Sequence, residues 1–132
     1  MTTYRELLAQ TKAEIDEIGT PEAHERLGSP ARPDAPLFLD VRELDEWQEG
    51  HIVGAIHIPR GNLESRIEGL VPDKERELFV YCAVGSRSAF AAKALTELGY
   101  TDVTSVSGGF TDWKRNGNPT KLPHTLDRKS VV

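Results

Sequence analysis

An apolar run passes directly into a turn of small residues at Leu78-Phe79-Val80-Tyr81-Cys82-Ala83-Val84-Gly85-Ser86-Arg87-Ser88. The run predicts a buried strand over 78–82, and the alanine-rich segment after the turn predicts a helix from Ser86 or Arg87 to about Leu98. In an open α/β sheet, ligands bind beyond the carboxyl ends of the strands. The single cysteine, Cys82, is therefore expected to face a helix N-terminus, where unpaired N–H groups stabilise a thiolate.

The rest of the chain alternates strand and helix patterns around this segment. Further strands are predicted at 14–18, 37–41, 55–58 and 103–106, although 14–18 could also end the first helix. Helices are predicted at 4–12, 20–28, 43–49, 62–67 and 110–115. The helix at 20–28 is predicted to begin at Thr20-Pro21, where a capping hydroxyl is followed by a proline at the first helical position. This alternation predicts an α/β fold with a five-stranded, mostly parallel sheet and helices on both faces.

The length of 132 residues predicts one domain with a single core. We assign an N-terminal helix to 1–13, the domain itself to 14–119 and a tail to 120–132. The polar sequence from Asn116 onward, which contains Pro119 and Pro123, predicts no regular structure. Such a tail could pack across the domain or mediate association.

Composition and charge argue against several classes of function. The net charge of −5, without a stripe of Lys and Arg, argues against a nucleic-acid surface. The longest apolar run, 78–84, is far shorter than the roughly 20 residues of a membrane helix, and the first residues contain no apolar signal core. One cysteine cannot form an intramolecular disulfide, which fits a reducing compartment. We therefore expect a cytoplasmic protein without nucleic-acid or membrane partners.

The residues after Cys82 favour a site for an anion or an ionised sulfur. The side chains of Ala83, Val84, Gly85 and Ser86 are small and neutral, so the backbone N–H groups can converge on one point. Arg87 adds a permanent positive charge. We expect these donors to keep the Cys82 thiol ionised and open to solvent. Two structural alternatives to this functional interpretation are left open: Cys82 could be an inert core thiol, and Ser86 could only cap its helix.

Three segments resemble the rhodanese (sulfurtransferase) family in its single-domain form, and the likeness runs from about Glu14 to Pro119. The first segment is Leu39-Asp40-Val41-Arg42-Glu43, continued by Glu46-Trp47, Gly50-His51-Ile52, Gly54-Ala55 and Ile58-Pro59. The second is the stretch from Cys82 to Arg87, in the place of the family's active-site loop. The third is Ser107-Gly108-Gly109-Phe110 with Trp113, which resembles the closing signature.

The resemblance implies a rhodanese-like fold and a catalytic Cys82 that carries sulfur as a persulfide, with Ala83, Val84, Gly85, Ser86 and Arg87 binding the substrate. It implies a small anionic sulfur donor, such as thiosulfate, and an external thiol, cyanide or protein as acceptor. Neither a metal nor an organic cofactor is implied. Ala83 and Val84 stand where the best-known members often carry basic side chains, so we expect only weak thiosulfate activity.

Three further residues are candidates for supporting roles. Asp40 could accept hydrogen bonds from the active-site loop or from Arg42, and Arg42 could face the pocket or pair with Glu46 one helical turn away. Trp113 has the character of a core residue, and the resemblance implies a place near the pocket rim. His51 and His57 have no ligand partner at metal-binding spacing and are interpreted as structural.

Two other functions compete with sulfur transfer. A cysteine, an amide loop and an arginine also bind phosphate in phosphatases and arsenate reductases. The related cell-cycle phosphatases have five residues between cysteine and arginine, whereas four separate Cys82 from Arg87, which implies a smaller pocket. The second alternative is a non-enzymatic module that carries sulfur or binds a partner.

Overall fold

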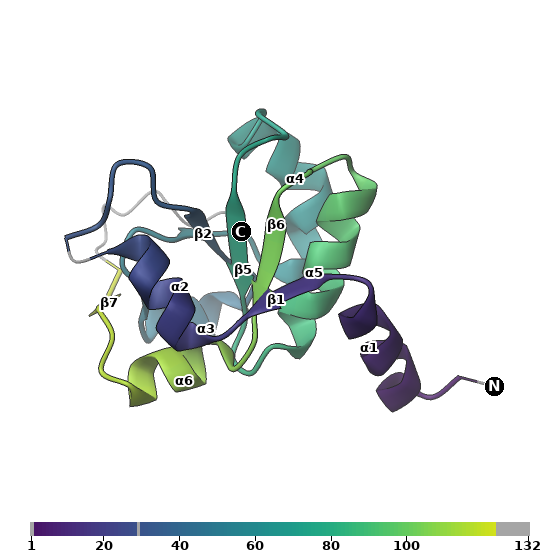
Figure 1. The fold of residues 1–132 in the computed structure, drawn as a ribbon, viewed down its shortest axis with the longest axis horizontal. Coiled ribbons are helices and arrows are strands. Elements are labelled where there is room, and N and C mark those ends of the chain that lie inside the picture. The colour runs from purple at the N-terminus through teal and green to yellow at the C-terminus, as the bar shows by residue number, and fades with distance from the viewer. Residues whose placement is uncertain (1, 29, 124–132) are drawn as a thin grey trace.

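The computed structural model describes residues 2–28 and 30–123, and its centre is a five-stranded parallel sheet. The strands lie in the order β1-β6-β5-β2-β4 (Figure 1). Their bounds are β1 Asp16–Ile18, β2 Leu37–Asp40, β4 Ile56–His57, β5 Leu78–Tyr81 and β6 Val103–Val106. The predicted α/β fold with five parallel strands is confirmed, and the segment at 14–18 does contribute the edge strand.

The middle strand β5 is buried on both faces, as its continuous apolar sequence requires. Successive side chains of a strand point to opposite faces. Leu78, Val80 and Cys82 consequently enter one core cluster, whereas Phe79 and Tyr81 enter the other. Cys82 follows the last residue of β5 and so lies at the carboxyl edge of the sheet, between its two layers of helices.

Helices cover both faces of the sheet, as Figure 1 shows. Their bounds are α1 Tyr4–Ala13, α2 Thr20–Leu27, α3 Leu44–Gln48, the 3₁₀ helix η1 Arg60–Asn62, α4 Leu63–Leu70, α5 Ser86–Glu97 and α6 Gly109–Arg115. Apolar residues of α4 and α5 enter the cluster of Cys82, and those of α2, α3 and α6 enter the cluster on the opposite face. α1 packs against α5. No helix in the described ranges is long and apolar enough to cross a membrane.

The start of α2 differs from the prediction. Gly19 occupies the N-cap position, and no side chain caps the helix. Thr20 is the first helical residue, and its hydroxyl instead accepts a hydrogen bond from the Asn116 side chain at 3.2 Å. The hydroxyl therefore ties α2 to the end of α6 rather than to its own first turn.

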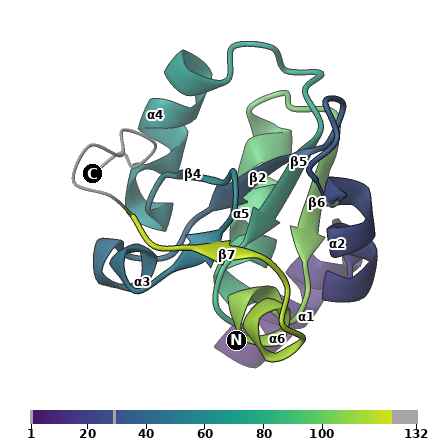
Figure 2. The same cartoon turned by 90° about the vertical axis from the view of Figure 1, so that its left-hand side faces the viewer.

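The tail contains a strand that the sequence did not predict. β7, Thr120–Lys121, pairs antiparallel with β3, His51–Ile52, and crosses the molecule between α3 and α6 (Figure 2). The prediction of no regular structure from Asn116 onward is thus wrong for these residues, while 124–132 lie outside the described part of the chain. Both side chains of β7 are exposed, so their pairing depends on backbone groups and leaves no apolar pattern in the sequence.

Candidate active site

Cys82 and the residues up to Arg87 form a tight connection between β5 and α5, which we call the Cys82 loop. Gly85 occupies the N-cap position of α5 with a left-handed backbone, φ 103°, a conformation that glycine adopts without the steric cost of a Cβ. Ser86 begins the helix, and no side chain caps it. The reading of Ser86 as a capping residue is therefore wrong, while Val84 is 64% exposed at the tip of the loop.

Backbone donors of this loop point at the cysteine sulfur. The Gly85 N–H donates to Cys82 Sγ at 3.1 Å, and the Ser88 N–H donates to the same atom at 3.4 Å. The Ser88 hydroxyl oxygen lies 3.6 Å from Sγ, where a thiol donates to it and a thiolate would accept from it. Two backbone N–H groups thus converge on one sulfur atom, and the Ser88 hydroxyl can add a third donor when the sulfur is a thiolate.

The pKa of the Cys82 thiol lies below its ordinary value because two opposing effects do not cancel. Burial of the sulfur raises the pKa, since it disfavours the charged form. Hydrogen bonds from the Ser88 hydroxyl, and from the backbone N–H groups of Ser88, Gly85 and Val84, lower it by more. The net effect favours the thiolate, which is the nucleophilic form of cysteine.

The sulfur is not open to solvent, contrary to the expectation from sequence. Cys82 is 0% exposed, because β5 is the central strand and the loop closes over its end. The donors nevertheless point toward Sγ, so the buried sulfur is a hydrogen-bonded polar group. A substrate can therefore reach Sγ only if the loop or the side chain shifts.

Ser88 is a site residue that the sequence analysis missed. It is fully buried in the first turn of α5, and its hydroxyl lies 2.9 Å from the hydroxyl of Ser105 on β6. Ser105 is also fully buried, so this pair connects the sulfur to the neighbouring strand. The available signal was a serine one residue beyond the loop, at the start of an otherwise alanine-rich helix.

Arg87 binds a carboxylate rather than lying free above the sulfur. Its two terminal nitrogens donate to the Glu46 carboxylate at 2.7 and 3.0 Å, in a bidentate arrangement between α5 and α3. The hydrogen bond with Arg87 is the main reason that the pKa of Glu46 falls to about 2. The positive charge beside the loop is therefore largely compensated, which the sequence alone did not indicate.

Asp40 and Arg42 form a buried ion pair at the end of β2. The Arg42 guanidinium donates to Asp40 Oδ2 at 2.8 Å, to Asp40 Oδ1 at 3.1 Å and to the Gly50 carbonyl oxygen at 2.7 Å. Of the alternatives left open, Asp40 thus binds Arg42, and Arg42 pairs with Asp40 instead of Glu46. The guanidinium also lies over the Phe110 ring, 4.4 Å from its centroid. The pair fixes the chain segment that enters α3.

The N-terminus of α6 holds the Cys82 loop from the other side. The Phe110 N–H donates to the Cys82 carbonyl oxygen at 2.8 Å, and the Thr111 N–H donates to that of Ala83 at 3.0 Å. This close approach requires Gly109, which has φ 56°, because a Cβ there would collide with the Cys82 carbonyl oxygen. The glycine-rich third segment of the sequence therefore positions the loop through backbone contacts.

Trp113, His51 and His57 are buried. Trp113 is fully buried, packs edge-on against Phe38 and donates its indole N–H to the Pro119 carbonyl oxygen at 2.9 Å. It therefore belongs to the core rather than to the rim of a pocket. His51 and His57 both stack on Trp47, and His57 Nε2 lies 2.7 Å from the Arg42 carbonyl oxygen. Among the residues that the structure describes, no three His, Cys, Asp or Glu side chains are grouped as metal ligands.

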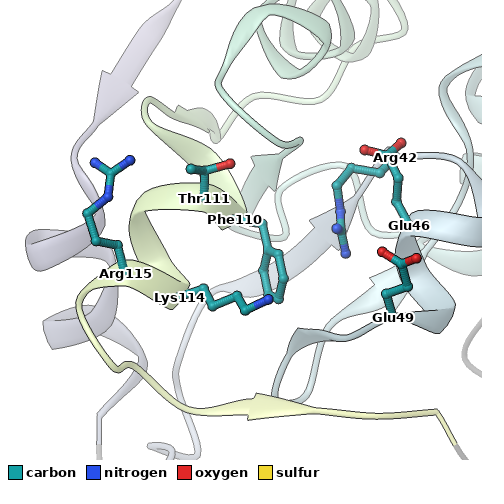
Figure 3. A pocket seen from close by; sticks show the side chains of 7 residues that line it. All are labelled: Arg42, Glu46, Glu49, Phe110, Thr111, Lys114 and Arg115. Carbon is teal, nitrogen blue, oxygen red and sulfur yellow. The ribbon is translucent and has the colours of Figure 1, made fainter.

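A hollow of about 530 Å³ lies beside the loop, between α3 and α6 (Figure 3). Its lining residues are Arg42, Glu46, Glu49, Phe110, Thr111, Lys114 and Arg115. In the figure the Lys114 side chain extends toward Phe110, whereas the Arg115 guanidinium points away from it. Glu46, Thr111 and Phe110 each contact the Cys82 loop, so the hollow adjoins the loop although Cys82 does not line it.

Comparisons with known proteins agree with this architecture. The family model of the Rhodanese-like domain matches residues 20–116. Thiosulfate sulfurtransferase PspE of Escherichia coli (strain K12) is 41% identical over 74 residues, which cover 56% of this chain and 71% of that protein. The putative sulfur carrier protein YrkF of Bacillus subtilis (strain 168) is 39% identical over 76 residues, 58% of this chain and 40% of that protein. The chain thus spans less than half of YrkF.

A solved structure from Rhodopseudomonas palustris CGA009, described as a protein of unknown function and a possible tyrosine phosphatase, superposes with a TM-score of 0.79. It is 30% identical, and the match covers 92% of this chain and 98% of that one. The range that the family model matches includes the Cys82 loop and the strands β2, β4, β5 and β6 around it. The chain is a member of the rhodanese-like domain family.

Proposed function

We propose that this protein is a sulfurtransferase that moves sulfane sulfur from a donor to an acceptor through a persulfide on Cys82. The observation that carries the proposal is the convergence of the Gly85 and Ser88 N–H groups on Cys82 Sγ, together with the lowered pKa of the thiol. These donors stabilise negative charge on sulfur both before the reaction, as a thiolate, and after it, as a persulfide anion.

The reaction consists of two displacements at sulfur. The Cys82 thiolate attacks the outer sulfur of thiosulfate, a new S–S bond forms, and sulfite leaves with the electron pair of the bond that breaks. A thiolate or cyanide then attacks the outer sulfur of the persulfide, and Cys82 leaves as a thiolate. The outer sulfur is transferred without a net change in protein oxidation state, so the cycle needs no further oxidant or reductant.

The acceptor must come from outside the chain. Cys82 is the only cysteine, so no internal thiol can form a disulfide with it and release the transferred sulfur. We propose an external thiol or a protein as acceptor, and the hollow between α3 and α6 as the side from which it approaches. A free cysteine also fits a reducing compartment, which supports our placement of the protein in the cytoplasm.

A non-enzymatic sulfur carrier is the main alternative, and the name of YrkF describes a putative carrier. Burial of Cys82 favours this alternative in one respect, since turnover requires repeated access to Sγ. An enzyme and a carrier would both form a persulfide on Cys82, and they differ in how fast that sulfur is turned over. Multiple turnovers with thiosulfate and cyanide support an enzyme, whereas a single stoichiometric transfer supports a carrier.

Phosphate-ester hydrolysis is the second alternative, because the Rhodopseudomonas palustris structure is described as a possible tyrosine phosphatase. That chemistry needs an arginine free to bind the phosphoryl oxygens. Here Arg87 binds Glu46 bidentately, and only four residues separate it from Cys82. We therefore expect negligible hydrolysis of p-nitrophenyl phosphate, and robust hydrolysis lost in Cys82→Ser would favour a phosphatase.

The turnover assay with thiosulfate and cyanide tests the proposed function. We expect measurable thiocyanate production by the native chain and none above background by Cys82→Ser, which replaces the sulfur by a hydroxyl of similar size. Thermal unfolding of the two proteins serves as the control that Cys82→Ser is folded. Equal activity in both would reject Cys82 as the nucleophile and with it the proposed mechanism.

A further inference from the structure

A second cation lies beside the Cys82 loop, and it comes from the N-terminal helix. Lys12 is in α1, before the segment matched by the family model. Its Nζ lies 3.9 Å from the position that a Cβ on Gly85 would occupy, and Gly85 donates directly to Cys82 Sγ. The packing of α1 on α5 thus brings a lysine to a loop whose own sequence contains only one charged residue, Arg87.

Each of these two cations has its own carboxylate. Lys12 Nζ donates to Glu17 on β1 at 2.7 Å, and Arg87 donates to Glu46 on α3 at 2.7 and 3.0 Å. β1 and the β2–α3 connection lie on opposite sides of β5 in the sheet order. The two ion pairs therefore flank the Cys82 loop from both sides, and their formal charges sum to zero.

We propose that Glu17 and Glu46 determine donor specificity by compensating the charges of Lys12 and Arg87. This inference rests on the proposed sulfur transfer and specifies its donor class. Thiosulfate is a dianion and gains from uncompensated cations near the reacting sulfur, whereas a persulfide on an organic thiol places less charge there. With both cations paired, the loop favours a thiol-bound persulfide as donor and binds free thiosulfate weakly.

The two carboxylates are positioning residues, since each acts on the substrate through the cation that it binds. Glu46→Gln is an informative change because glutamine keeps an acceptor oxygen for the Glu43 N–H, which donates to Glu46 at 2.9 Å in the first turn of α3. It removes the negative charge that binds Arg87 and replaces one of the two oxygens that accept from Arg87 by an NH2 group. Glu17→Gln does the same for Lys12 from an exposed position on an edge strand.

Steady-state kinetics with two donors tests the inference. We measure KM and kcat for thiosulfate and for cysteine persulfide, at a saturating concentration of cyanide, in the native chain and in Glu17→Gln, Glu46→Gln and their combination. We expect each single change to lower the KM for thiosulfate roughly three- to tenfold, as for the loss of one partly exposed charge pair. In Glu17→Gln, a residue that does not line the hollow between α3 and α6, the KM for cysteine persulfide and both kcat values should stay within about twofold of the native ones.

Two controls separate charge compensation from a structural effect. Asp45→Asn removes an exposed carboxylate from the same helix as Glu46 and should leave the KM for thiosulfate unchanged. Adding Lys12→Met to Glu17→Gln should abolish the gain, because the cation that attracts the dianion is then absent. High salt should also reduce the gain, since it screens exposed charges.

An unchanged KM for thiosulfate in both glutamine variants would overturn the inference, as would an equal fall in KM for both donors. Neither result would affect the proposed function, because Cys82 would still turn over. If the native chain formed no persulfide on Cys82, that result would instead reject the proposed sulfur transfer itself.

Discussion

At the scale of single residues, the site is a sulfur atom and the donors that point at it. Cys82 Sγ is fully buried, a situation that alone would raise its pKa and suppress the thiolate. The hydrogen bonds from Ser88, Gly85 and Val84 outweigh that effect. A buried sulfur can therefore have a lowered pKa here because the first turn of α5 begins directly beside it.

Ser88→Ala should raise the pKa of Cys82. The hydroxyl of Ser88 is the largest of the contributions that lower this pKa, and its loss also removes the partner of Ser105. Because the native pKa lies below the ordinary value, the thiolate population rises with pH through that lower pKa and should do so at higher pH in the variant. The pH dependence of Cys82 alkylation by a small reagent measures this shift.

Thr96→Ala is a matched control on the same helix, since the Thr96 hydroxyl donates to the Ala92 carbonyl oxygen far from the sulfur. It should leave the alkylation profile unchanged. Identical profiles for Ser88→Ala and the native chain would contradict the assigned role of the Ser88 hydroxyl.

The residues of the Cys82 loop could be predicted from the sequence better than the side chains that other elements bring to the loop. Cys82 and Gly85 could be predicted because a strand, a small-residue turn and a helix follow one another in 11 residues. The pairing of Arg87 with Glu46 and the approach of Lys12 to Gly85 could not, because residues far apart in the sequence are brought together only by the fold. Burial of the sulfur was equally hidden, since it depends on how the loop closes over β5.

At the scale of elements, the arrangement depends on the contact between the Cys82 loop and the start of α6. Two backbone hydrogen bonds join them, from Phe110 to Cys82 and from Thr111 to Ala83. Gly109 permits this approach because it has no side chain and adopts a positive φ. The helix therefore holds the carbonyl side of the loop while α5 supplies N–H groups on the other side.

Gly109→Ala should destabilise the protein more than Gly54→Ala. Both glycines have positive φ, a conformation that costs other residues on the order of 1–3 kcal/mol. A Cβ on Gly109 also meets backbone atoms of Cys82 and Ala83, whereas a Cβ on Gly54 has nothing within 4 Å. Chemical denaturation of the two variants measures the difference, and equal losses of stability would contradict the close packing of α6 on the loop.

The segment that follows α6 contributes to the core through Pro119. Its carbonyl oxygen accepts the indole N–H of the fully buried Trp113. A chain ending at Asn118 leaves that donor without its partner and loses the β3–β7 pairing, at a cost of at least about 1–3 kcal/mol for the donor alone. A chain ending at Pro123 keeps both contacts. Thermal unfolding should rank the Pro123 form well above the Asn118 form, and equal midpoints would show that β7 is dispensable.

Strands with a clear apolar sequence pattern could be predicted, and strands without one could not. β5 and β6 match the expected bounds to within one residue, because most of their side chains are buried. β3 and β7 contain two residues each and were missed, and the exposed side chains of β7 give no apolar pattern. The Thr20 cap was wrong because a tertiary contact with Asn116 takes its hydroxyl.

At the scale of the whole molecule, α3 and α5 are joined across the sheet edge by the Glu46–Arg87 ion pair. The pKa of Glu46 is about 2 in the folded protein, below its ordinary value of 4.5. A carboxylate with a depressed folded pKa contributes stability that is present above the unfolded pKa and is lost as the pH falls through the folded one. This contribution therefore exists in full above about pH 5 and disappears toward pH 2.

Glu46→Gln should accordingly lower the midpoint of thermal unfolding at neutral pH and have progressively less effect as the pH falls from 5 to 2. Paired unfolding curves of the native chain and the variant at several pH values measure this convergence. A difference that stays constant over that range would show that the carboxylate charge is not what joins the two helices.

The account as a whole depends on Cys82 being a nucleophile that retains the transferred sulfur. Intact mass spectrometry after incubation with thiosulfate, or with cysteine persulfide, tests this most directly. We predict a single adduct of about 32 Da on the native chain, removed by cyanide and absent from Cys82→Ser. A native chain that stays unmodified with both donors, or an adduct of the same mass on Cys82→Ser, would contradict the central claim.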